Sequence, residues 1–369
     1  MFKVVVVCLA LAIVPIALAQ EFSEQFRKLD RNKDGELTKA ELPGPLFEVI
    51  DVNKDGVITA FEDQNFVSKN RGQAGTQAAT AKNSDKIKVE RDIPYTENQN
   101  PRQRLDLFLP KTPKSDKPLP MVIFIHGGAW QAGDKRVGYN AISSLVESGE
   151  YAGASIGYRL SSEQIWPAQI HDCKAAIRWL KANAKKYNLD PDRFGVTGTS
   201  AGGHLVAMLG TSGGVSELEG NLGGNIDVSS RVACVVDQFG PTDLLSMGGS
   251  HNNANSPESN LIGGAIQQKA DAARNASPTR YVSKDDPPFM LIHGTNDPLV
   301  PFNQSEILAK ALKDVGVEAL LVPVVGGGHG NFGTPEVPNR VKAFFDKHLL
   351  KREASVTTEP IQAGVAAQK

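Results

Sequence analysis

Gly198-Thr199-Ser200-Ala201-Gly202 decides how this chain folds, because the pattern G-x-S-x-G places a serine at a sharp turn between a strand and a helix. The apolar run Arg193 to Val196 stands before this turn, and the helix-like residues 201–209 follow it. Two further matches to the pattern, around Ser155 and Ser212, lack this context, because one lies inside a strand-like segment and the other in a glycine-rich loop. The strand, turn and helix therefore predict that Ser200 is an exposed nucleophile.

A reactive serine also needs N–H donors for the oxyanion that forms when it attacks a carbonyl group. The apolar strand Met121 to Ile125 runs into His126-Gly127-Gly128-Ala129-Trp130, where glycines allow a close approach of the backbone to a substrate. We predict that the N–H groups of Gly127, Gly128 and Ala201 are these donors. His126 is expected to hold the loop rather than to react. Trp130 is interpreted as a wall of the substrate pocket, with a packed core position as the alternative.

The base and its orienting acid are predicted from the ends of two later strands. The strand Pro288 to Ile292 ends in His293-Gly294-Thr295-Asn296-Asp297, and a carboxylate just past a strand can orient an imidazole, so Asp297 is the predicted acid. His329 and His348 are the histidines that follow Asp297. His348 stands near the end of the last helix, where a cation suits the helix C-terminus, so His329 is the predicted base. The other histidines, His171, His204, His251 and His293, are expected to have structural roles.

These residues together resemble the α/β-hydrolase superfamily of esterases. The likeness is greater to the BD-FAE type, bifunctional acetyl and feruloyl esterases of carbohydrates, than to the hormone-sensitive-lipase branch, since Ala129 and Thr199 stand where that branch usually has Gly and Asp. The resemblance covers about residues 85 to 350. It implies an α/β-hydrolase fold, with a mostly parallel doubly wound sheet, and a serine carboxylesterase acting on a small ester or an acylated polysaccharide.

The alternation of strand-like and helix-like segments also predicts a mostly parallel sheet. The predicted strands are 105–109, 121–125, 152–157, 194–196, 232–236, 289–292 and 320–325. Two Gly- and Asn-rich stretches, 211–225 and 248–255, either border the substrate pocket as a partial lid or are plain surface loops.

A second motif occurs twice near the N-terminus. Residues 30–41 and 51–62 each fit the twelve-residue EF-hand loop, with oxygen ligands at positions 1, 3, 5, 7, 9 and 12 and Gly at position 6. The predicted ligands of two structural Ca²⁺ ions are Asp30, Asn32, Asp34, Glu36, Thr38, Glu41, Asp51, Asn53, Asp55, Val57, Thr59 and Glu62.

The EF-hand pair is compact, because Pro43-Gly44-Pro45 between the loops prevents one long helix. It resembles the small calcium modules, including dockerin-like ones, that are appended to exported bacterial hydrolases. A sensor would need longer helices to open a groove, so a structural clamp is expected.

Residues 1–19 have the pattern of a signal peptide: a positive start, an apolar stretch too short to span a bilayer, and Ala17-Leu18-Ala19 as a cleavage site. A retained membrane anchor is the alternative. We therefore expect an exported protein, periplasmic or extracellular, without stable membrane insertion. Cys173 and Cys234, which remain after cleavage, are expected to be buried free thiols.

Composition completes the domain division. The chain has 369 residues, is 40% hydrophobic and has a formal charge of −1, with no basic patch suited to nucleic acid. We expect an EF-hand module at 20–66, a flexible linker at 67–86, the catalytic domain at 87–351 and a disordered tail at 352–369. Two other functions stay open: a serine peptidase of the prolyl-oligopeptidase type, and a non-catalytic calcium-dependent binding protein on a hydrolase fold.

Overall fold

The computed structural model describes residues 24–32, 36–51, 56–59, 62–63 and 84–364. The chain divides into two compact units, residues 1–80 and 81–369. The predicted signal peptide and residues 67–83 of the predicted linker lie outside the described residues. Among the helices that are described, none combines the length and the apolar character that crossing a bilayer requires.

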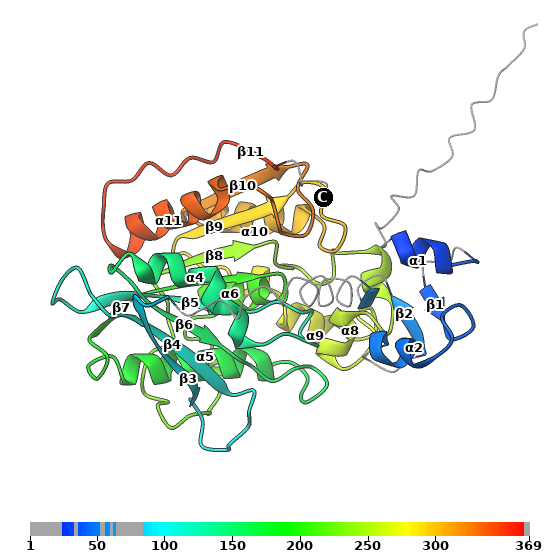
Figure 1. The fold of residues 1–369 in the computed structure, drawn as a ribbon, viewed down its shortest axis with the longest axis horizontal. Helices are drawn as coiled ribbons and strands as arrows, with labels where there is room; N and C mark the ends of the chain where they lie inside the picture. The colour runs from blue at the N-terminus through cyan, green and yellow to red at the C-terminus, as the bar shows by residue number, and fades with distance from the viewer. Residues whose placement is uncertain (1–23, 33–35, 52–55, 60–61, 64–83, 365–369) are drawn as a thin grey trace, which may run out of the picture. The chain divides into compact units, whose positions relative to one another are not determined.

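The larger unit is built on one sheet, whose nine described strands lie in the order β11-β10-β9-β8-β7-β5-β6-β4-β3 (Figure 1). β4 pairs antiparallel with β3 and β6, and the other neighbours are parallel. This arrangement confirms the predicted α/β-hydrolase fold. The strands are β3 Ile87–Pro94, β4 Arg104–Pro110, β5 Leu119–Ile125, β6 Ala152–Ile156, β7 Leu189–Thr199, β8 Cys234–Gln238, β9 Phe289–Gly294, β10 Ala319–Val325 and β11 Ile361–Gln362.

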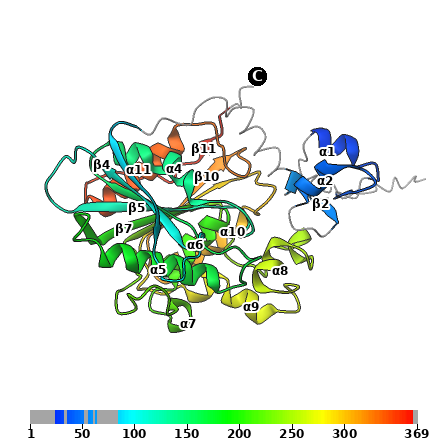
Figure 2. The same ribbon diagram turned by 60° about the horizontal axis from the view of Figure 1, so that its bottom comes forward.

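Helices cover both faces of this sheet. Figure 2 shows α4 (Gly138–Glu147) and α11 (Glu336–Leu349) on one side of it, and α5 (Ala168–Ala182) on the other. The second side also carries α6 (Ala201–Thr211) and α10 (Asn303–Asp314), whose apolar residues share one core with those of α5. The shorter helices are η1 Lys135–Val137, α7 Ser216–Glu219, η2 Gly249–Asn252, α8 Pro257–Ile262, α9 Ala270–Asn275 and η3 Pro278–Tyr281.

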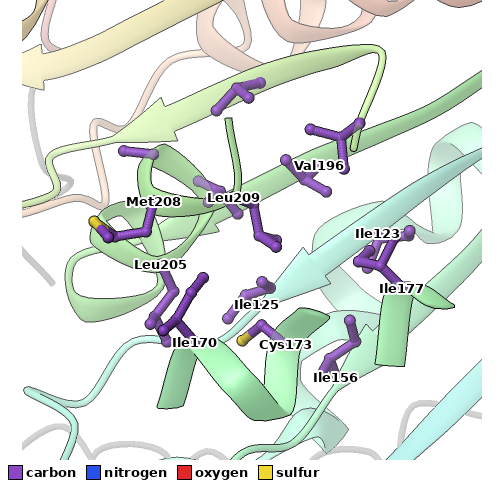
Figure 3. Close-up of a cluster of buried hydrophobic side chains, with 14 of the residues drawn as sticks. Ile123, Ile125, Ile156, Ile170, Cys173, Ile177, Val196, Leu205, Met208 and Leu209 are labelled. Carbon is purple, nitrogen blue, oxygen red and sulfur yellow. The ribbon is translucent and has the colours of Figure 1, made fainter. Parts of the chain in front are cut away.

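β5 shows why the central strands are continuous apolar runs. Ile123 and Ile125 point into the core beneath α5 and α6, where Figure 3 shows Ile125 near Ile170 and Leu205, and Ile123 near Ile177. Phe124, between them, points into the separate core beneath α4 and α11. Each face of the strand is therefore buried, as parallel sheets require.

The two cysteines lie in different cores, as expected for unpaired thiols. Cys173 belongs to the core beneath α5 and α6, and Cys234 to the core on the opposite face of the sheet. Both are buried free thiols, which confirms the prediction. Burial raises the pKa of each thiol well above its usual value, so neither is a reactive thiolate.

The prediction of a disordered tail is wrong for residues 352–364. Ile361 and Gln362 form β11 along the edge of β10, and the side chain of Ile361 is 1% exposed. The amide of Gly364 also donates to the carbonyl of Phe332 at 2.8 Å. The tail has no apolar period because the residues that pack on the core, Val356, Ile361 and Ala363, are irregularly spaced, and backbone bonds to β10 and to Phe332 add to this packing. Residues 365–369 lie outside the described part.

The smaller unit has a core of its own. Its elements are α1 (Glu24–Leu29), β1 (Glu36–Thr38), α2 (Pro45–Ile50) and β2 (Val57–Thr59). β1 and β2 pair antiparallel, which joins the two predicted calcium loops through their positions 7 to 9. Phe26, Leu37, Phe47, Ile50 and Ile58 are buried together. Pro45 stands at the start of the six-residue α2, as the sequence predicted for a short helix between the loops.

Candidate active site

Ser200 lies at a strained turn between β7 and α6. Its φ of 56° and ψ of −123° are unfavourable for a residue with a side chain, and such strain is typical of functional sites. The turn is tight: a Cβ atom on Gly198 would lie 2.3 Å from the carbonyl oxygen of Gly202, and one on Gly202 would lie 2.1 Å from that of Ile125. These clashes explain why both positions in the motif are glycine.

The other two serines of the pattern have structural positions. Ser155 is fully buried within β6. The hydroxyl of Ser212, at the end of α6, donates to the carbonyl of Met208 at 2.5 Å. Neither lies at a turn from a strand into a helix.

Asp297 is held by four hydrogen-bond donors. Its Oδ1 accepts from the amides of Leu299 and Val300 at 2.8 and 2.9 Å. Its Oδ2 lies 2.7 Å from Nδ1 of His329 and 3.2 Å from Nε2 of His293. Burial alone would raise the pKa of Asp297, but the hydrogen bonds from the two histidines and the charge of His329 lower it well below its usual value. The carboxyl group is therefore ionised and can only accept hydrogen bonds.

The three predicted catalytic residues follow β7, β9 and β10, and β8 connects them. The amide of Ser200 donates to the carbonyl of Gln238, the last residue of β8, at 2.9 Å. The next residue, Phe239, has a φ of 48°, and its ring meets that of His329 at a tilt of 64°, with 4.7 Å between centroids. Because these strands are parallel, their carboxyl ends bring Ser200, Asp297 and His329 to one edge of the sheet.

The predicted oxyanion loop lies against this turn. A Cβ atom on Gly127 would lie 2.7 Å from the carbonyl oxygen of Thr199 and 3.2 Å from Cβ of Ser200, so only glycine fits beside the serine. Gly128 has a φ of +115°, which also favours glycine. Ala201 is the first residue of α6, where backbone N–H groups have no partner within the helix.

His126 holds this loop, as expected. Its ring is buried and stacks on Tyr158 with 4.3 Å between centroids, and Nδ1 lies 2.8 Å from the carbonyl oxygen of Gly127. Burial lowers the pKa of His126 to about 4, so the ring is neutral at physiological pH.

The interpretation of Trp130 as an open pocket wall is wrong. Its side chain is 1% exposed, lies in the core beneath α5 and α6, and donates from Nε1 to Nδ1 of His204 at 3.2 Å. The cause is local: Ala129 and Trp130 both have positive φ values, 52° and 59°, which turn the chain back and carry the indole inward. The alternative interpretation, a packed core tryptophan, is the one that the structure supports.

The two Gly- and Asn-rich stretches differ in their relation to the site. The stretch 211–225 begins at the end of α6 opposite Ser200, about 15 Å away for an eleven-residue helix. Its Glu219 pairs with Lys174 at 2.7 Å and with Arg178 at 3.3 Å, which anchors it on α5 as a surface loop.

The stretch 248–255 is linked to α8, because Nδ1 of its His251 lies 3.0 Å from Oε1 of Glu258. Burial would lower the pKa of its His251, but the hydrogen bond and charge of Glu258, 3.0 Å away, raise it, and the charge of Asp297 adds to this effect.

A cavity of about 400 Å³ lies behind the nucleophile turn, between α4 and α11. Its lining includes Thr197 and Thr199 of β7 and Gln238 of β8. No pattern in the sequence predicted this cavity.

The smaller unit contains nine of the twelve predicted calcium ligands within the described residues, while Asp34, Asn53 and Asp55 lie outside them. The carboxylate of Glu41 accepts from the amide and hydroxyl of Thr38 at 3.0 and 2.9 Å, and these bonds lower the pKa of Glu41. Oδ2 of Asp51 accepts from the amide of Gly56, whose φ is +91°. Within the described ranges, no three acidic, histidine or cysteine side chains converge as a metal cluster. The nine predicted calcium ligands within the described residues are Asp30, Asn32, Glu36, Thr38, Glu41, Asp51, Val57, Thr59 and Glu62.

Sequence reasoning missed His293 and Phe239 as parts of the site. His293 was interpreted as a structural histidine, although its place four residues before Asp297, at the end of a strand, is a signal that it could reach the acid. Phe239 directly follows a buried strand that neighbours the nucleophile strand, which is the corresponding signal.

Comparison with known proteins agrees with this geometry. The BD-FAE family model matches residues 105–312, and the EF hand model matches residues 22–42 and 45–67. Esterase LipC of Mycobacterium tuberculosis (strain ATCC 25618 / H37Rv) is 32% identical over 235 residues, which are 63% of this chain and 57% of LipC. The chain thus spans little more than half the length of this curated relative.

Two solved structures are similar over most of the larger unit. A truncated form of a carbohydrate esterase from gut microbiota is 36% identical with a TM-score of 0.68, covering 72% of this chain and 98% of that chain. A bifunctional GH43-CE protein of Bacteroides eggerthii is 37% identical with a TM-score of 0.65, covering 71% of this chain and 35% of that chain. Fold, site and family model agree, and the chain belongs to the BD-FAE family of α/β-hydrolases, with EF hands at its N-terminus.

Proposed function

We propose that this protein is an exported serine carboxylesterase that hydrolyses short-acyl or feruloyl esters on carbohydrate, with Ser200 as nucleophile, His329 as base and Asp297 as acid. The observation that carries the proposal is the 2.7 Å contact between Asp297 and His329, at the same sheet edge as the strained Ser200. The similar proteins named above are esterases, and one is called a carbohydrate esterase, which supports this substrate class. The pattern of residues 1–19 supports export.

The Asp297–His329 contact assigns the proton on the imidazole. Because ionised Asp297 can only accept, Nδ1 of His329 carries the hydrogen, and the lone pair is left on Nε2. Nε2 then takes the proton of the Ser200 hydroxyl while Oγ attacks the ester carbonyl carbon. The imidazolium gives that proton to the departing alcohol oxygen, which leaves an acyl-enzyme. A water molecule, deprotonated by the same nitrogen, releases the acid and restores the serine.

The oxyanion of both steps is assigned to the N–H groups of Gly127, Gly128 and Ala201. Gly127 lies directly against Ser200, and Ala201 begins a helix whose N-terminus favours negative charge. Removing one such donor typically costs about 100- to 1,000-fold in kcat.

The same proposal includes a structural role for Ca²⁺ in the smaller unit. The predicted ligands supply carboxylate, amide, hydroxyl and carbonyl oxygens, which suit this hard cation. The positive φ of Gly56 and the pairing of β1 with β2 fit two loops that fold around ions. Bound Ca²⁺ would neutralise the acidic side chains and stabilise the loops, and no catalytic step passes through it.

The central experiment compares Ser200→Ala with the controls Ser155→Ala and Ser212→Ala on p-nitrophenyl acetate. We expect a loss on the order of 10⁶ in kcat for Ser200→Ala, and near-normal activity for the controls, whose hydroxyls lie away from the site. Near-normal activity of Ser200→Ala would contradict the mechanism.

A substrate panel then tests the ester. We expect acetyl esters, and feruloyl esters, to be cleaved faster than octanoyl esters, and acetylated xylan to release acetate. Faster cleavage of peptide substrates would indicate a peptidase, and hydrolysis of no substrate would indicate a binding protein, so either outcome contradicts the proposal.

A further inference from the structure

His293 is a fully buried histidine next to the proposed triad, and the mechanism above does not use it. It lies near the end of β9, and its side chain is 0% exposed. Nε2 lies 3.0 Å from the carbonyl oxygen of Val300 and 3.2 Å from Oδ2 of Asp297. Nδ1 lies 2.8 Å from Oγ of Ser305.

These partners assign the hydrogen on the ring. The carbonyl oxygen of Val300 and the ionised carboxylate of Asp297 can only accept, so Nε2 of His293 carries the hydrogen, which it donates to Val300 with Oδ2 of Asp297 3.2 Å away. Nδ1 then faces the Ser305 hydroxyl, which can donate to it. The ring is fixed at both nitrogens, and its N–H lies beside the carboxylate oxygen that also accepts from His329.

We propose that His293 is a positioning residue, whose Nε2–H holds Oδ2 of Asp297 in line with Nδ1 of His329. The inference rests on the proposed function. Two amides fix Oδ1 of Asp297, and His293 fixes Oδ2, so the carboxylate cannot rotate without losing hydrogen bonds on both oxygens. Groups that orient a catalytic side chain act by this kind of support.

The proposed base, His329, needs the support of Asp297 because the glycine-rich loop before it makes few contacts that could fix its position. His329 follows Gly326-Gly327-Gly328, and a Cβ atom on Gly328 would meet no atom within 4 Å, so that side of the loop is not packed. The Asp297 carboxylate and the ring of Phe239 are the contacts that orient the imidazole within the described residues. A carboxylate held by His293 therefore fixes the base as well as the acid.

Three substitutions separate positioning from packing. His293→Gln can keep an N–H near the place of Nε2, facing Asp297, whereas His293→Asn can keep a polar group only near the place of Nδ1, facing Ser305. His293→Leu keeps neither. The Gln and Asn variants each lose the hydrogen bonds of one ring nitrogen of buried His293. The melting temperatures of these two variants should therefore fall by similar amounts.

We expect His293→Asn and His293→Leu to lose roughly 10- to 100-fold in kcat for p-nitrophenyl acetate with little change in KM, and His293→Gln to stay within a few-fold of the unsubstituted protein. Titration of Ser200 with an organophosphate that esterifies it, carried to its end point, corrects kcat for any unfolded fraction. Equal kcat values for the Gln and Asn variants would overturn the positioning role, and so would a loss that appears in KM alone. If the proposed function itself is wrong, Ser200→Ala will remain active, and this result differs from the two outcomes that overturn the positioning role.

Discussion

The substitution Asp237→Asn should stabilise the larger unit, and it should do so only above acidic pH. Asp237 lies on β8 with a side chain that is 0% exposed. Oδ1 accepts from the amide of Gly240 at 2.9 Å, and Oδ2 has no hydrogen-bond partner within the described residues. Burial raises the pKa of Asp237 from 3.8 to about 7, although the hydrogen bond from Gly240 acts in the opposite direction.

The sign of the pH dependence follows from this shift. Between pH 4 and 7 the folded state keeps the proton of Asp237 and the unfolded state has released it, so stability is lost as the pH rises through this range. Above about pH 7 the loss is complete. The gap between 3.8 and about 7 corresponds to about 4 kcal/mol. Asparagine has no proton to lose, so Asp237→Asn should raise the free energy of unfolding by up to about 4 kcal/mol at pH 8 and by only about 1 kcal/mol at pH 4.5.

Urea unfolding followed by tryptophan fluorescence measures this difference on the full chain. All three tryptophans, Trp130, Trp166 and Trp179, lie in the larger unit, so the signal reports its unfolding alone. Asp172→Asn is the matched control, because Asp172 is equally buried but pairs with Arg159 at 2.7 Å. Losing that partner should destabilise the control at pH 8. A gain for Asp237→Asn that is the same at pH 4.5 and pH 8, or a loss at pH 8, would refute this account of Asp237.

The two other predictions concern the base and the calcium unit. Phe239→Leu should lower kcat about tenfold, because the ring of Phe239 orients His329. Phe332→Leu is the control: it changes a ring 5.8 Å from that of Phe239 and should lower kcat less. Equal losses in the two variants would show that packing alone is disturbed. Chelation of Ca²⁺ should reduce the circular dichroism of the smaller unit and leave ester hydrolysis in place, with recovery at roughly 10⁻⁴ to 10⁻³ M free Ca²⁺ or lower. Glu41→Gln should raise the Ca²⁺ concentration needed for that recovery. A reversible loss of ester hydrolysis on chelation would contradict the prediction that the EF-hand unit is a structural clamp separate from the active site.

The sheet and the proposed triad could be predicted because buried apolar runs mark the strands, and the triad residues stand where these strands end. A buried run of apolar residues predicts a strand, and Ser200, Asp297 and His329 each stand just after such a run. Parallel strands bring these positions to one edge, and the 2.7 Å contact between Asp297 and His329 agrees with that expectation.

Backbone reversals and single anchors could not be predicted in the same way. Trp130 turns inward because two consecutive residues other than glycine adopt positive φ, and no residue type announces this conformation. β11 depends on the edge of β10 and on a few irregularly spaced apolar residues around Ile361, so the tail shows no period. The sequence indicates that β9 ends near His293, but not which ring nitrogen meets Asp297, because that depends on the turn that brings Val300 back.

The order of β7, β9 and β10 along the chain also sets when the proposed site can be complete during synthesis. Ser200 leaves the ribosome about 130 residues before His329, which at about 5 to 20 residues per second is a delay of roughly ten seconds. In that interval β7 and α6 can form with the serine in place, yet the base has not been made. β9 and β10 join the sheet only through crossovers, and such non-local pairings form slowly. The proposed triad is therefore complete only after β10 has joined the sheet.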